Sequence, residues 1–245
     1  MAMSEMPLLQ HLLELRSRLL RALMAVGLML LVTAFFAKDL YHHLALPLIS
    51  HLPKGASMIA TDVASPFFAP FKLALVLAFF AAMPAILYQI WAFVAPGLYQ
   101  HERRLVAPLL AVSSLLFYGG IAFAYFVVFP VIFAFFTSVA PEGVTIATDI
   151  SSYLDFVLKL FFAFGLAFEI PIFVLLLCYT GVTDIQSLSA KRPYIVVIAF
   201  TLGMLLTPPD VISQTLLAVP MWLLFESGLL MARLVGLKPK DEEPS

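Results

Sequence analysis

Apolar residues occur in long runs along the chain, separated by short polar segments. A helix needs ~20 apolar residues to cross a hydrocarbon core of ~30 Å. The six candidate runs are residues 19–37, 67–94, 105–139, 153–179, 194–206 and 211–235. Each is expected to be helical, because an open strand edge leaves backbone groups unsatisfied in lipid. The pattern predicts an all-α integral membrane protein with six transmembrane helices, of which the fifth and sixth are short.

The fifth run is the shortest. Its roughly 14 residues reach only ~21 Å at 1.5 Å per residue, about 9 Å less than a typical core. Such a helix either thins the bilayer locally or is covered by a partner. A re-entrant hairpin formed with the sixth run is the alternative.

Proline and serine positions predict where helices bend and begin. Proline inside a helix removes a hydrogen bond and bends the helix, so we expect bends within the runs. The prolines concerned are Pro84, Pro130, Pro171 and Pro220. Ser65-Pro66 is typical of a cap followed by proline, and Ser152-x-x-Asp155 is typical of a capping box.

The composition supports a membrane location. Hydrophobic residues make up 62% of the chain and charged residues 12%, with a mean hydropathy of +1.02. Soluble domains carry roughly 25% charged residues, so this surface needs lipid as its solvent. We expect one membrane domain over residues 1–245, with a cytoplasmic amphipathic segment at 1–18 and a polar tail at 236–245. A net charge of −1 gives no field that attracts nucleic acid.

Lys and Arg predict the orientation. With a cytoplasmic N-terminus, two of them, Lys38 and Lys54, fall on the far side of the membrane. Ten fall on the cytoplasmic side, namely Arg16, Arg18, Arg21, Arg103, Arg104, Lys191, Arg192, Arg233, Lys238 and Lys240. This asymmetry follows the positive-inside rule and places both termini in the cytoplasm.

The chain carries no pattern typical of an enzyme. It has no H-E-x-x-H or G-x-S-x-G motif and no cluster of metal ligands, so we expect no catalytic residue, metal or cofactor. The five histidines all lie outside the apolar runs. His42-His43 is interpreted as part of a solvated loop, since adjacent residues point apart on a helix; a metal site is the alternative.

Two cytoplasmic carboxylates stand out. Residues 8–21 place Glu14 and Arg18 on a polar face and leucines on the other, which predicts an amphipathic helix that runs into the first span. The simplest interpretation is an interfacial anchor with Glu14–Arg18 as an i,i+4 ion pair. Arg16 falls on the apolar side, which fits a headgroup contact or a buried partner. The second carboxylate is Glu102, which precedes Arg103 and Arg104. The positive-inside rule explains these two arginines but does not explain Glu102.

Glu169 is the outlier within the spans. A carboxylate at that depth costs ~3 kcal/mol or more to insert, so it is a functional candidate. A protonated glutamate bonded to a neighbouring helix is the structural alternative. Gln89, Gln214 and Glu226 are interpreted as structural.

Five motifs carry a family resemblance. In chain order they are His11-Leu12-x-Glu14-Leu15-Arg16-x-Arg18, Ile59-Ala60-Thr61-Asp62-Val63-Ala64-Ser65-Pro66-Phe67, Phe93-x-Ala95-Pro96-Gly97-Leu98-Tyr99-x-x-Glu102-Arg103, Phe164-Gly165-x-x-Phe168-Glu169-x-Pro171 and Thr207-Pro208-Pro209-Asp210. From about residue 7 to 233 the chain closely resembles the TatC family, the signal-peptide receptors of the twin-arginine protein translocase. Enterobacterial members are especially similar.

The resemblance implies a receptor rather than an enzyme. It implies that the chain acts with TatA and TatB, two single-span partners, and with other copies of itself in the lipid bilayer. Folded proteins that carry twin-arginine signal peptides would then cross the bacterial inner membrane, driven by the proton-motive force. It assigns Glu14 and Glu102 as the principal contacts of the paired arginines, with Phe93 and Arg16 nearby.

The remaining implied roles lie deeper in the membrane or beyond it. Glu169 would be a membrane-embedded acid that faces a concave interior. Met204, Thr207 and Gln214 would contact partner helices, and Pro47 and Asp210 would belong to the periplasmic side. A proton-coupled secondary transporter that uses Glu169 as its proton carrier is the alternative function.

Overall fold

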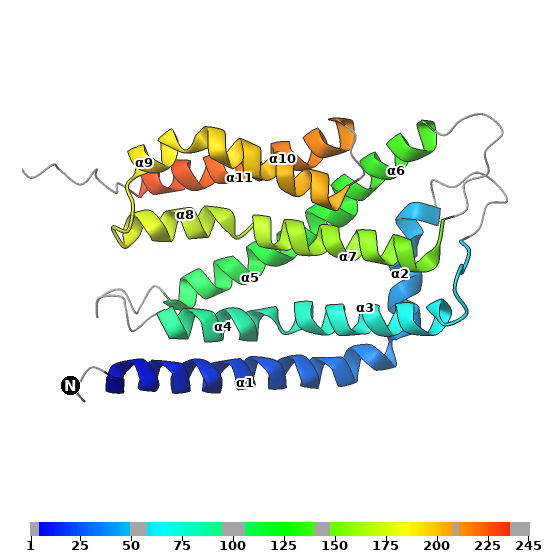
Figure 1. Ribbon diagram of the computed structural model, residues 1–245, viewed down its shortest axis with the longest axis horizontal. Helices are drawn as coiled ribbons and strands as arrows, with labels where there is room; N and C mark the ends of the chain where they lie inside the picture. The colour runs from blue at the N-terminus through cyan, green and yellow to red at the C-terminus, as the bar shows by residue number, and fades with distance from the viewer. Residues whose placement is uncertain (1–4, 50–57, 95–105, 140–147, 208–210, 236–245) are drawn as a thin grey trace, which may run out of the picture. The chain divides into compact units, whose positions relative to one another are not determined.

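The computed structural model describes residues 5–49, 58–94, 106–139, 148–207 and 211–235 (Figure 1). Its helices are α1 (Glu5–Phe35), α2 (Ala37–Ile49), α3 (Ser65–Ala81), α4 (Met83–Val94), α5 (Val106–Phe123), the π-helix η3 (Ala124–Val128), α6 (Phe129–Ser138), α7 (Ile150–Ala167), α8 (Ile170–Tyr179), α9 (Ile185–Ala190), α10 (Arg192–Leu206) and α11 (Val211–Leu234). The all-α prediction is confirmed.

The chain divides into two compact units. The first comprises residues 1–45 and 60–114, and the second comprises residues 46–59 and 115–245. In the first unit α1 packs along α3 and α4 (Figure 1). The Thr33 hydroxyl on α1 donates a 2.8 Å hydrogen bond to the Ala74 carbonyl on α3. Since that carbonyl belongs to a helix backbone, the bond fixes the two helices at close range.

The second unit is built around α11. This helix packs against α8 on one side and α10 on another. Its core is rich in aromatic rings, and Phe129 contacts both Phe133 and Phe161, at centroid distances of 5.8 and 5.2 Å. An isolated bridge lies at one end of the unit, where Ile59 donates to the Thr148 carbonyl and accepts from the Ile150 amide.

Among the residues that the structure describes, four helical segments are long and apolar enough to cross a membrane: Leu12–Phe35, Ala107–Ser138, Ile150–Tyr179 and Val211–Leu234. The consecutive segments Ser65–Ala81 and Met83–Phe93 form a fifth span if their 47° bend lies within one crossing. The helix α10, at 15 residues, is short, as the sequence predicts. The prediction of a short sixth helix is wrong, because α11 has 24 residues and is long enough to cross a membrane. The count of six spans and the cytoplasmic termini stay predictions.

Three of the four prolines coincide with helix interruptions. Pro84 follows the bend between α3 and α4, Pro130 follows the π-helix η3, and Pro171 is in the first turn of α8. In contrast, α11 continues through Pro220 as one helix. A bend of 47° is thus confirmed near Pro84, whereas Pro130 and Pro171 lie where the helix changes type or breaks inside one long apolar segment.

The predicted caps are wrong by one to three residues. Helix α3 has Ala64 as its N-cap, so Ser65 is already helical. Helix α7 begins one turn before the predicted capping box, because the Asp149 carboxylate accepts hydrogen bonds from the Ser152 amide and hydroxyl at 2.9 and 3.0 Å. The neighbouring bridge to Ile59 holds Asp149 in the extended conformation that an N-cap requires.

The segment after the first span is also more ordered than predicted. His42 and His43 lie in helix α2 rather than in a loop. Asp39 in the first turn of α2 favours the helix through its dipole. The two imidazole rings are 6.2 Å apart, and no group of three or more metal-ligating side chains occurs within the described ranges.

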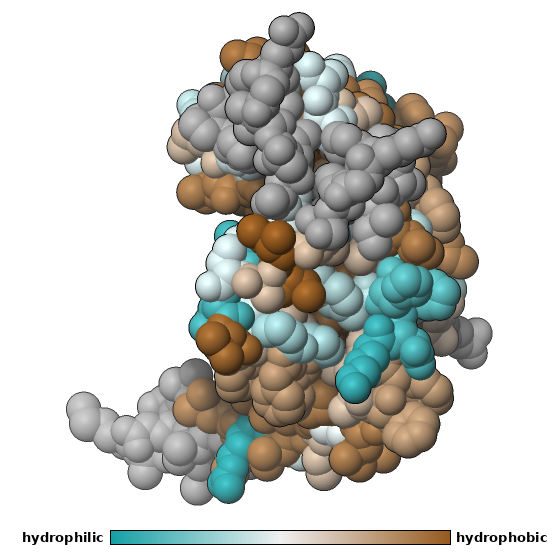
Figure 2. Space-filling model, turned by 90° about the vertical axis from the view of Figure 1, so that its right-hand side faces the viewer, coloured by the Kyte–Doolittle hydropathy of each residue, from teal (hydrophilic) through white to brown (hydrophobic). Residues whose placement is uncertain are grey.

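Large apolar side chains are exposed along the outer faces of the helices. Examples are Leu31 on α1, Phe126 on η3 and Leu205 on α10. Figure 2 shows such apolar side chains at the surface, beside polar ones, on the face that it presents. This surface suits a hydrocarbon solvent, in which no hydrophobic penalty attaches to exposure.

Candidate functional site

The first unit carries an occupied carboxylate on α1. Arg18 donates to Glu14 from both Nε, at 3.0 Å, and Nη2, and both donors reach the same oxygen, Oε1. The predicted i,i+4 pair is therefore confirmed. The Glu14 side chain is 38% exposed and that of Arg18 is 18% exposed. A carboxylate on this face can thus hold a guanidinium.

Of the other residues assigned to this site, the structure describes Phe93 and Arg16. Phe93 is half-buried at the end of α4, which packs beside α1 in the same unit. Arg16 is exposed on α1, which favours the headgroup contact over the buried partner among the two alternatives. Glu102 lies outside the described residues. The structure therefore places Glu14, Arg16 and Phe93 on two adjacent helices.

Glu169 lies at the break between α7 and α8 in the second unit. It is the residue before the first turn of α8, where Pro171 interrupts the helical hydrogen bonds. Its side chain is partly buried, and the Oε1 atom is fully enclosed. The positive end of the α8 dipole lies next to the carboxyl group, which favours a polar or negative side chain there.

A close helix crossing positions this break. At Gly120 on α5, an added Cβ would lie 2.3 Å from the Phe164 carbonyl oxygen and 3.0 Å from the Gly165 Cα on α7. One turn further along, the Phe123 ring contacts the Phe164 and Phe168 rings at 5.5 and 5.6 Å. The backbone of α7 just before Glu169 is consequently fixed against α5.

A bidentate ion pair joins the start of α10 to the C-terminal half of α11. Arg192 on α10 donates from Nε and Nη2 to the two carboxylate oxygens of Glu226 on α11, at 2.5 and 2.8 Å. Glu226 is interpreted from the sequence as structural, and this contact agrees with that interpretation. The partner was missed because it lies 34 positions away, beyond any helical spacing. In the sequence, Arg192 lies just before the run 194–206 and Glu226 lies within the run 211–235, so the two charges are not marked as a pair.

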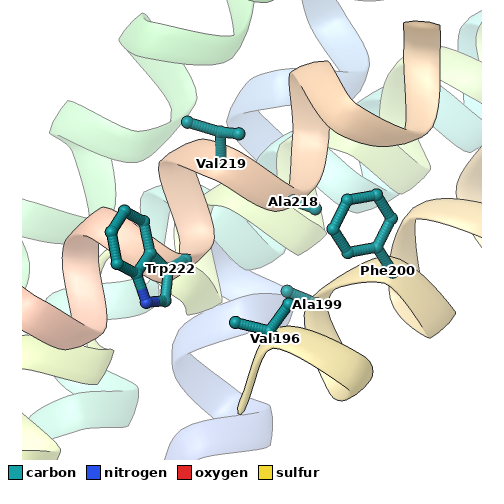
Figure 3. A pocket seen from close by; sticks show the side chains of 6 residues that line it. All are labelled: Val196, Ala199, Phe200, Ala218, Val219 and Trp222. Carbon is teal, nitrogen blue, oxygen red and sulfur yellow. The ribbon is translucent and has the colours of Figure 1, made fainter. Parts of the chain in front are cut away.

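Helices α10 and α11 also enclose an open apolar groove of about 160 Å³ (Figure 3). Ala199 and Ala218 are buried at its floor. The larger side chains around them are Val196, Phe200, Val219 and Trp222. Small residues at the floor let the helices approach each other and leave space for an apolar group between the larger side chains.

The three residues assigned to partner contact lie on this helix pair in different environments. Met204 is exposed on α10, and Gln214 is half-buried on α11, where its backbone closely approaches Gly203. Thr207 is buried, and its hydroxyl donates to the Gly203 carbonyl at 2.9 Å. The Thr207 hydroxyl therefore already has an acceptor within its own helix.

Of the two residues assigned to the periplasmic side, the structure describes only the backbone of Pro47. Pro47 belongs to the helical backbone of α2, within residues Ala37–Ile49. Asp210 lies outside the described residues. The helix break before it, at Thr207, separates α10 from α11.

Known proteins share both the sequence and the fold. The family model for Sec-independent protein translocase protein (TatC) matches residues 10–220. The TatC of Haemophilus influenzae is 61% identical over 237 residues, covering 97% of this chain and 92% of that protein. The TatC of Escherichia coli K12 is 57% identical over the same shares of both chains. A crystal structure of the twin arginine translocase receptor TatC matches with a TM-score of 0.83 at 38% identity, covering 92% of this chain and 99% of that one.

These matches extend over nearly the whole chain and agree with its apolar helical segments. They identify a multi-pass protein of the bacterial inner membrane that serves protein transport rather than an enzymatic reaction, and none of them supports a small-solute transporter. The chain therefore belongs to the TatC family of Sec-independent protein translocase proteins.

Proposed function

We propose that this chain is the receptor subunit that binds twin-arginine signal peptides for the translocase. The observation that carries the proposal is the Glu14–Arg18 contact, in which a carboxylate on α1 binds a guanidinium. The solved relative is described as a twin arginine translocase receptor, which supports the same role. The peptide site would comprise Glu14, Arg16 and Phe93 in the first unit, together with Glu102.

The chemistry of the site suits paired arginines. A guanidinium presents two parallel N–H donors that match a carboxylate, and such charge-assisted contacts are roughly twice as strong as neutral hydrogen bonds. On a predicted cytoplasmic face rich in Lys and Arg, Glu14 and Glu102 are scarce acceptors. Discrimination against other basic peptides would arise because only a correctly spaced arginine pair satisfies both carboxylates.

Charge reversal at Glu102 tests the proposal. Glu102→Lys should abolish binding of a twin-arginine peptide, because it replaces an acceptor with a cation beside two arginines. Glu14→Ala should weaken binding less. Site-specific crosslinking of a labelled peptide to the full chain in membranes measures both effects.

The control is His101→Lys, which adds the same charge at the adjacent position and retains both carboxylates. It should bind the peptide nearly as well as the parent, and all three variants should insert normally. If Glu102→Lys binds the peptide as well as the parent does, the assignment of Glu102 is wrong.

The proposed transport cycle needs partners. TatA and TatB would dock on the α10–α11 face, at Met204 and Gln214 with Thr207 behind them, and the proton-motive force would drive export. The apolar groove between these helices supports a docking role for this face. Glu169 would supply a polar group within the receptor cavity, and Pro47 and Asp210 would act on the periplasmic side. Other copies of the chain are further expected partners.

A further inference from the structure

The Glu14 carboxylate is asymmetrically occupied. Both Arg18 donors converge on Oε1, which uses the two lone pairs of that oxygen. No other described residue donates a hydrogen bond to Glu14, so Oε2 keeps its accepting capacity. One oxygen is thus saturated and the other is available.

This occupancy limits how a second guanidinium can bind. A side-on, bidentate contact needs one N–H at each oxygen of the carboxylate. An incoming arginine can approach Oε2 while Arg18 stays in place, but it reaches Oε1 only after Arg18 has left. Two guanidiniums on one carboxylate also leave an excess positive charge, and their repulsion favours release of one of them.

We propose that Arg18 is an intramolecular competitor for Glu14, which an arginine of the bound peptide displaces, and that it thereby sets the affinity of the site. The proposal rests on the proposed peptide-binding function. Binding then proceeds by capture at Oε2 followed by exchange at Oε1. The released Arg18 has a long side chain that can extend towards lipid headgroups.

The exchange is energetically accessible. An i,i+4 ion pair on a helix is weak, so the peptide loses little affinity by having to break it. Compared with a Glu14 that has no partner, the Glu14–Arg18 pair should lower the peptide affinity about twofold. If the ion pair had only a structural role, removing Arg18 would not tighten peptide binding. If Arg18 served to orient Glu14 for the peptide, its removal would weaken binding.

A double-mutant cycle on the full chain in detergent tests the competition. The probe is a synthetic twin-arginine peptide, titrated against the parent, Arg18→Gln, Glu14→Gln and the double variant. Arg18→Gln should tighten binding at least about twofold. In the Glu14→Gln background its gain should be no larger than that of Arg21→Gln, since there is then no carboxylate to release.

Arg21→Gln is the matched control, because Arg21 lies on the same predicted face two turns from Glu14 and loses the same charge. Any gain from Arg21→Gln should be smaller than that from Arg18→Gln and should persist without the Glu14 carboxylate. Arg18→Lys, which keeps the charge with a single nitrogen donor, should give an intermediate affinity.

Weaker peptide binding by Arg18→Gln, or an equal gain in the presence and absence of the Glu14 carboxylate, would overturn the competition. A parent chain that binds no twin-arginine peptide would instead refute the proposed function, and the competition with it. The two failures are therefore distinguishable in the same titrations.

Discussion

The close crossing of α5 and α7 leads to a sharp prediction at Gly120. In Gly120→Ala the new Cβ would lie 2.3 Å from the Phe164 carbonyl oxygen, whereas ordinary contacts begin near 3.4 Å. The helices must separate by about the difference, 1.1 Å, because the obstructing atoms belong to the backbone and cannot rotate away. Overpacking of this kind costs ~3 kcal/mol at the upper end of its usual range.

Alanine also has a higher helix propensity than glycine, which returns ~1 kcal/mol. The net loss is therefore about 2 kcal/mol, and we expect the apparent unfolding temperature in detergent to fall by ~4–8 °C. Thermal unfolding at a fixed scan rate, followed by loss of soluble monomer, measures it. Export of a twin-arginine reporter should fall as well, because Phe164 and Gly165 lie in the last turn of α7, just before the break at Glu169.

The neighbouring residue supplies the control. In Gly119→Ala the new Cβ would lie 3.9 Å from the Phe168 ring, which is an ordinary contact. This variant gains the same helix propensity without a clash, so its unfolding temperature should stay equal to that of the parent or rise by ~2 °C. Equal unfolding temperatures for the two variants would refute the close crossing.

Two further predictions concern the proposed sites. Glu169→Gln keeps the size and polarity of the side chain and should retain most export at matched membrane levels, whereas Glu169→Ala leaves a void and should retain less; an inactive Gln variant would indicate that Glu169 must ionise. Met204→Ala combined with Gln214→Leu should weaken co-purification of the single-span partners about three- to tenfold, because contacts between helices are lost, and should leave peptide binding unchanged. Undiminished co-purification would show that the partners do not dock on the α10–α11 face.

The sequence by itself determined the features that depend on local spacing. The helical runs, the short α10 and the interruptions near Pro84 and Pro171 were predictable, since helices in lipid must satisfy their backbone hydrogen bonds within each segment. The Glu14–Arg18 pair was also predictable, because residues four positions apart lie on the same face of a helix. The resemblance of five ordered motifs then indicated the family, which the comparisons confirm.

Only the tertiary structure decided which residues meet across the fold. Arg192 pairs with Glu226 over 34 positions, Gly120 meets Phe164, and Asp149 rather than Ser152 caps α7 beside the bridge to Ile59. Helices in lipid are apolar on all sides, so hydrophobic periodicity does not distinguish a lipid-facing residue from a buried one. The burial of Thr207 and the exposure of Met204, three residues away on the same helix, follow from how α10 packs against α11.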